Sequence, residues 1–139
     1  MGKTTYVEGG VMLGVRHRGA IALSCEEARD ITRGVLGAHG VVDRLLDDVL
    51  TVVTELVSNA RRHAGGVVGF GVRCTRDAVV VEVADGSRNR PVAPGTPVDL
   101  PGGFGWLLVN RLAQRTEVRL RGDGKTITAL LPRPHVLSP

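Results

Sequence analysis

The sequence has few aromatic residues, which limits the ligands that it can bind by stacking. Phenylalanine, tyrosine and tryptophan make up 3% of its 139 residues. Proteins that bind single-stranded nucleic acid stack the bases on several such side chains. The net charge of +4 comes mostly from arginines spread over every segment, and Lys3 and Lys125 are the only lysines. We therefore expect the positive charge to serve an acidic protein partner and expect no direct nucleic-acid binding.

Cysteines and long apolar runs are scarce as well. The two cysteines, Cys25 and Cys74, have no metal-binding spacing, so we expect reduced thiols in a cytoplasmic protein. No apolar run approaches the roughly 18 residues of a membrane span, and no charged-then-apolar leader opens the chain. The hydrophobic content of 42% is nevertheless sufficient for a core. The sequence predicts one folded domain without a membrane segment.

The spacing of apolar residues predicts an α+β fold with helices on one face of a mixed, mainly antiparallel sheet. Ser24 and Glu27 have the spacing of a capping box, which predicts that the first helix begins at Ser24. We expect a loose tail over 1–10, one domain over 11–132 and a second tail over 133–139. The predicted helices are 24 to 37 or 40, 43–63 and 105–113, and the predicted strands are one or two within 11–23, then 67–74, 78–85, 115–121 and 125–131.

A segment rich in proline and glycine, from Ser87 to Phe104, separates the predicted strand 78–85 from the third predicted helix. It is long for a connector inside a compact domain, which makes it a candidate lid. Further on, Gly122 to Thr126 reads GDGKT and ends like a phosphate-binding P-loop. A strand rather than a helix follows it, so the sequence favours a hairpin turn there.

The stretch TVVTELVSNARRHA, from Thr51 to Ala64, predicts a helix with an unusual polar stripe. At about 100° per residue its apolar side chains gather on one face. Glu55 and Asn59 point the same way one turn apart, close enough to share a water, a metal ion or a phosphate. For a generic amphipathic helix a solvated face is the ordinary interpretation. The polar side comprises Asp48, Thr51, Glu55, Asn59 and Arg62.

Two later segments favour a binding site over that ordinary interpretation. The strand pattern VVVEVAD ends in Asp85, whose carboxylate could accept a hydrogen bond from an exocyclic amine and so distinguish adenine from guanine. A turn or cap carboxylate is the alternative for Asp85. In GGFGWLLVNRLA, Gly103 and Gly105 precede an apolar helical run and would let backbone N–H groups approach phosphates.

Together these segments resemble the GHKL superfamily of ATP-binding proteins, and within it the bacterial anti-sigma-factor serine/threonine kinases. ELVSNARRHA resembles the N box of that family, VEVADGS its G1 box and GGFGWLLV its G2 box. Gly124-Lys125-Thr126 resembles the position of its last conserved threonine. The resemblance runs from about Ala20 to Leu131 and implies a two-layer α/β sandwich of the GHKL, or Bergerat, type.

The resemblance also implies roles for individual residues. Glu55 would be the catalytic base, Asn59 the ligand of Mg²⁺, and Asp85 the reader of adenine. His63 stands in the last turn of its helix, where a surface residue that complements the helix dipole is the common alternative. Contacts with ATP are implied for Asn59, Arg62, His63, Asp85, Ser87, Gly103, Phe104, Gly105, Trp106, Leu107 and Thr126.

The activity that the resemblance implies is that of an anti-sigma factor and protein kinase. Such a protein sequesters a sigma factor, phosphorylates an antagonist protein of the STAS type, and works as a homodimer. The chain departs from the family pattern at Ser87 and Asn89, where many members have glycine, and at Trp106, where a smaller residue is usual. A second hypothesis is therefore a nucleotide-binding regulatory module with weak or no catalysis that acts by protein–protein interaction.

Overall fold

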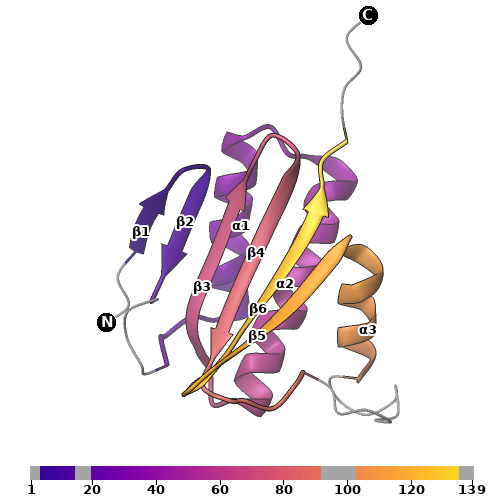
Figure 1. The fold of residues 1–139 in the computed structure, drawn as a ribbon. Helices are drawn as coiled ribbons and strands as arrows, with labels where there is room; N and C mark the ends of the chain where they lie inside the picture. Colours follow the sequence, from indigo (N-terminus) through magenta and orange to yellow (C-terminus); the bar gives the residue numbers. More distant parts are fainter. Residues whose placement is uncertain (1–3, 15–19, 92–102, 135–139) are drawn as a thin grey trace, which may run out of the picture.

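The computed structural model describes residues 4–14, 20–91 and 103–134, which form one sheet and three helices (Figure 1). The strands lie in the order β1-β2-β3-β4-β6-β5. Among the described residues, no helix is long and apolar enough to cross a membrane. The elements are β1 (Thr4–Val7), β2 (Gly10–Leu13), α1 (Cys25–Ala38), α2 (Asp43–His63), β3 (Val67–Cys74), β4 (Ala78–Asp85), α3 (Gly103–Leu112), β5 (Arg115–Arg121) and β6 (Gly124–Pro132).

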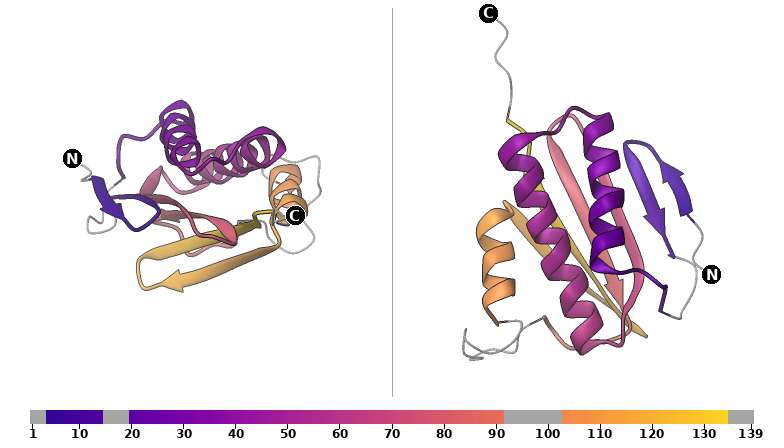
Figure 2. Two further views of the ribbon diagram at one scale, coloured as in Figure 1. Left: turned by 90° about the horizontal axis from the view of Figure 1, so that it is seen from above. Right: turned by 180° about the vertical axis from the view of Figure 1, so that it is seen from behind.

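The helices cover one face of the sheet, as the two views in Figure 2 show. α1 and α2 lie side by side on that face, and α3 packs beside α2 near β5 and β6. The predicted two-layer α+β sandwich is confirmed. The sheet differs from the expected mixed sheet, because every strand pair among the described residues is antiparallel. Three of these pairs, β1–β2, β3–β4 and β5–β6, are hairpins, a connection that imposes antiparallel pairing.

Both expected tails contain ordered contacts. Thr4–Val7 forms β1, because Gly9 adopts a positive φ of 81° and closes a hairpin in which Val7 pairs with Gly10. Arg133 donates hydrogen bonds from its guanidinium to the backbone oxygens of Thr75 (3.0 Å) and His39 (3.0 Å). The expectation of a loose N-terminal tail is thus corrected for the described residues 4–10.

The core lies between the sheet and the helices and consists mainly of valine and leucine. Alternation along β4 and β6 sends every second side chain to the helix side of the sheet. On β4 these include Val81 and Val83, and on β6 Ile127 and Ala129, all of which are buried. The same alternation decides which polar side chains at the strand ends face the helices.

A capping box begins α1, as predicted. The hydroxyl of Ser24 accepts a hydrogen bond from the backbone N–H of Glu27 (3.0 Å), and the carboxylate of Glu27 accepts one from the backbone N–H of Ser24 (3.1 Å). The backbone N–H of Ser24, and after it the Ser24 hydroxyl, stabilise the Glu27 carboxylate by hydrogen bonding and lower the pKa of Glu27 below its usual value of 4.5. Because the pKa of Glu27 is lower in the folded protein than in the unfolded chain, the ionised carboxylate stabilises the fold at neutral pH. This stabilisation is lost as the pH falls through the lowered pKa.

Replacing Ser24 by alanine is expected to lower the free energy of unfolding by about 1 kcal/mol, because an orphan N–H of the first turn loses its acceptor. Urea denaturation at neutral pH measures this change. Ser24→Thr, which keeps a hydroxyl at the cap, should cost clearly less. An equal loss in both variants would contradict the capping explanation.

Candidate functional site

A cleft of about 200 Å³ opens where the second half of α2 faces the ends of β4 and β6. It brings together four of the residues that the sequence nominated, which are Asn59, His63, Asp85 and Ser87. Several of its side chains carry charges or amide groups, and Ile127 supplies an apolar wall. The lining residues are Asn59, His63, Asp85, Ser87, Asn89, Arg90, Pro91, Lys125 and Ile127.

Asp85 and Lys125 form a buried ion pair in the wall of this cleft. The two residues are direct cross-strand partners on β4 and β6, and 3% and 4% of their surfaces are exposed. The Lys125 Nζ lies 3.0 Å from Asp85 Oδ1 and 3.0 Å from Oδ2. It also donates to the backbone oxygen of Ser87 (3.2 Å), whose N–H in turn donates to Asp85 Oδ1 (2.9 Å). The carboxylate and the ammonium therefore compensate each other in a place that water hardly reaches.

Sequence reasoning missed Lys125 as a residue of the cleft and nominated Thr126. Thr126 pairs with Ala84 on the face of the sheet away from the helices, where it lines a separate hollow with Met12 and Arg121. The signal that could have found Lys125 is the alternation of β6, since Ile127, Ala129 and Leu131 all face the core. A residue two positions before Ile127 must face the same side.

The polar stripe of α2 is not an ordinary solvated face. Asn59 is 5% exposed, and Glu55 is half-buried. The Asn59 Oδ1 accepts a hydrogen bond from the guanidinium of Arg62 (3.2 Å), which uses one of its two lone pairs. Its Nδ2 is buried and has no partner among the described residues. Buried amide groups are normally satisfied, so this side chain has unused hydrogen-bonding capacity beside the cleft.

Glu55 contacts the first turn of α3. A Cβ added at Gly105 would lie 2.2 Å from Glu55 Oε2, so a larger residue there would displace the carboxylate from its present position. The backbone N–H groups of a first helical turn have no partners within the helix and carry partial positive charge. Glu55 thus stands beside the region where the sequence predicted a phosphate cradle.

The other nominated residues are on α2 and α3, near the cleft and the contact of Glu55 with Gly105. Arg62 and His63 are exposed at the end of α2, and Trp106 is partly buried against the core. Leu107 is 38% exposed on α3 and does not line the cleft. Gly103 and Phe104 begin α3, and the side chain of Phe104 and positions 92–102 of the candidate lid are outside the described residues.

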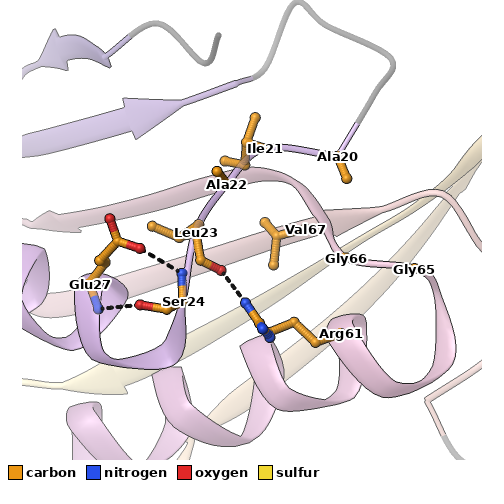
Figure 3. A pocket seen from close by; sticks show the side chains of 10 residues that line it. All are labelled: Ala20, Ile21, Ala22, Leu23, Ser24, Glu27, Arg61, Gly65, Gly66 and Val67. Atoms are coloured by element: carbon orange, nitrogen blue, oxygen red, sulfur yellow. Dashed lines mark hydrogen bonds between the residues drawn. The ribbon is translucent and has the colours of Figure 1, made fainter.

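A second and larger cavity, of about 380 Å³, lies at the other side of α2 (Figure 3). Its main polar groups already have partners within the protein. The guanidinium of Arg61 donates to the backbone oxygen of Leu23 (3.0 Å), and Ser24 and Glu27 form the capping box. None of the nominated residues lines this cavity. The chemistry therefore favours the smaller cleft as the candidate site.

The predicted boxes and this geometry agree with what comparison with known families finds. The family model described as the histidine kinase-like ATPase domain matches residues 21–131, which include all three helices and β3 to β5 in full. No curated protein shows a significant match to the chain. The match covers most of the sequence and includes the residues of the candidate site on α2, β4 and β6. The chain therefore belongs to the histidine kinase-like ATPase domain family, an ATP-binding family of the GHKL superfamily.

Proposed function

We propose that the protein is a Mg-ATP-dependent anti-sigma factor and serine/threonine protein kinase. It would sequester a sigma factor and phosphorylate an antagonist protein in the cytoplasm. The observation that carries this proposal is the placement of Glu55 and Asn59 on one face of α2, with Glu55 against Gly105 at the start of α3. A half-buried carboxylate beside the positive end of a helix suits a base that acts next to a phosphate.

The side chains present fit a magnesium ion that is shared with a nucleotide. Mg²⁺ prefers hard oxygen ligands and usually keeps waters and phosphate oxygens in its shell. Asn59 Oδ1 has a lone pair left after its bond with Arg62, and the neighbouring Nδ2 is free to donate to a phosphate oxygen. Among the described residues no group of three or more His, Cys, Asp or Glu side chains comes together. When bound, the ion would neutralise charge on the phosphates.

The chain itself would contribute positioning and one proton transfer. Glu55 would accept the proton of the attacking serine or threonine hydroxyl, which makes the oxygen a better nucleophile. The first turn of α3 would direct its N–H groups to the phosphates. Asn59 would orient the polyphosphate from the floor of the cleft. These groups come from two packed helices, a support that holds such a geometry more firmly than loops do.

The fluorescence of Trp106 during titration with ATP tests the nucleotide site. Trp106 is the only tryptophan and follows Gly105 directly. We expect a saturable change that requires Mg²⁺ and that weakens at least about tenfold in Asn59→Ala, because the amide is lost as a ligand. Thr51→Ala, two turns away on the same helix face, should behave like the unchanged protein. A flat fluorescence trace together with a flat calorimetric titration would refute nucleotide binding.

Gly105 offers a second test, directed at the geometry around Glu55. Gly105→Ala is expected to lower phosphotransfer about 10- to 100-fold, because the new methyl group displaces the carboxylate from its position. Transfer of label from γ-labelled ATP to candidate STAS-type antagonists measures it. Gly34→Ala is the matched control, since a Cβ there meets nothing within 4 Å. That variant should keep full activity and gain about 0.5 to 1 kcal/mol of stability.

A second candidate function is a regulatory module that binds nucleotide and partners but transfers no phosphate. The specific observation in its favour is that Asp85, the expected reader of adenine, is already paired with Lys125.

In either function the protein would form a homodimer, for which the exposed edge strand β1, with Tyr6 83% exposed, offers a surface. Sedimentation equilibrium tests the dimer. Label transfer to an antagonist separates the two functions.

A further inference from the structure

The ammonium of Lys125 stands directly in front of the carboxylate of Asp85. Its Nζ is equidistant from the two carboxylate oxygens, at 3.0 Å from each. The backbone N–H of Ser87 takes a further lone pair of Oδ1. The side chains of Lys125 and Asp85 are 5% and 4% exposed, so little of the carboxylate is open to another donor. A ligand that enters the cleft meets a carboxylate whose acceptor sites are largely in use.

The exocyclic amine of adenine cannot readily displace this ammonium. Both groups are hydrogen-bond donors, but only the ammonium also carries a positive charge that attracts the carboxylate. Removing Lys125 from the carboxylate without a replacement charge would leave a buried anion unpaired. The amine would therefore compete for Asp85 at a disadvantage.

The backbone around the pair also holds the two side chains in place. The guanidinium of Arg121 donates to the backbone oxygens of Asp85 (2.9 Å) and Lys125 (3.1 Å). A Cβ added at Gly124 would lie 2.0 Å from the backbone oxygen of Asp85, so the β5–β6 hairpin turn packs tightly on the end of β4. The two strand ends that carry the pair are thus clamped to each other.

We propose that Lys125 is a specificity-determining residue of the nucleotide cleft, because it withdraws Asp85 from recognition of the adenine amine. The inference rests on the proposed function, in that the cleft takes a nucleoside triphosphate. The three N–H donors of the ammonium face the two carboxylate oxygens of Asp85 and the backbone oxygen of Ser87, so Lys125 is itself committed to these acceptors. The cleft therefore binds purine triphosphates without selecting for an amine.

The test compares ATP with purine riboside triphosphate, which lacks the exocyclic amine. Dissociation constants for both come from Trp106 fluorescence and calorimetry with the full chain and Mg²⁺. For the unchanged protein we expect the two constants to agree within about twofold, with GTP within about tenfold of them. Lys125→Thr frees Asp85, so ATP should then bind at least about tenfold more tightly than the analogue, the effect of one recovered bond to a charged group.

Lys125→Arg keeps the positive charge and should leave the ratio near one. Thermal melting establishes that each variant is folded. If Lys125→Thr does not fold, the ratio of the two dissociation constants measured for the unchanged protein tests the inference by itself. A tenfold preference of the unchanged protein for ATP would overturn the inference, and so would a folded Lys125→Thr variant without such a preference. Either result leaves the proposed function intact. If neither protein binds any triphosphate, both the inference and the nucleotide site of the proposed function fail.

Discussion

Replacement of Glu55 by alanine is expected to lower phosphotransfer about 100- to 10,000-fold, the range that a positioned general base contributes. The affinity for ATP should stay within about threefold, because Glu55 does not line the cleft that holds Asn59 and Asp85. Single-turnover transfer of label to an antagonist protein measures the first quantity, and Trp106 fluorescence the second. A loss of this size at constant affinity would assign Glu55 to the chemical step.

Two further variants separate proton transfer from packing. Glu55→Gln keeps the size of the side chain and its contact with Gly105 but cannot act as a base, so it should be as inactive as the alanine variant. Asp48→Asn changes a carboxylate on the same face of α2 two turns earlier and should have no effect. Unaltered transfer in Glu55→Gln would remove Glu55 from the mechanism.

Replacement of Lys125 by alanine should produce the largest loss of stability, about 3 to 5 kcal/mol. The reason is that the buried carboxylate of Asp85 loses the ammonium that compensates it. Urea denaturation measures the free energy of unfolding. Thermal melting should show a decrease of roughly 10 °C or more for a domain of this size. The double variant Asp85→Asn with Lys125→Met, which has neither charge, should recover a large part of the loss.

An exposed ion pair of similar length provides the matched control. On β5 a guanidinium nitrogen of Arg119 lies 2.9 Å from Glu117 Oε1, but the side chains of Arg119 and Glu117 are 75% and 53% exposed. Solvent screens such a pair, so Arg119→Ala should cost less than about 1 kcal/mol. Equal losses in Lys125→Ala and Arg119→Ala would show that burial does not determine the cost of breaking these pairs.

Long, regular patterns were predicted well from the sequence. The bounds of α2, β3 and β4 agree with prediction, because many apolar residues repeat at one period in each. β1 was missed because it has only four residues, all of them exposed, and therefore no buried face that a pattern could reveal. Its pairing depends on the turn at Gly9 instead.

The structure brings some of the nominated site residues together and adds others, and the difference has two physical causes. Asn59, His63, Asp85 and Ser87 line one cleft. Lys125 was missed because a shift of one residue along a strand moves a side chain to the opposite face.

The second cause is separation along the chain, as in the contact of Glu55 with Gly105. These two residues lie 50 positions apart in the sequence, on different helices. Such contacts depend on how α3 packs on α2, which no local pattern contains.

The order of the strands has a consequence for how the chain acquires its structure during synthesis. Asp85 lies at the end of β4, whereas its counter-ion arrives on β6, the last of the described strands in chain order. A nascent chain that stops before β6 lacks both the strand that pairs with β4 and the ammonium that compensates the Asp85 carboxylate. The domain should therefore complete its folding only after its C-terminal hairpin has left the ribosome, and truncated products should be open to proteolysis.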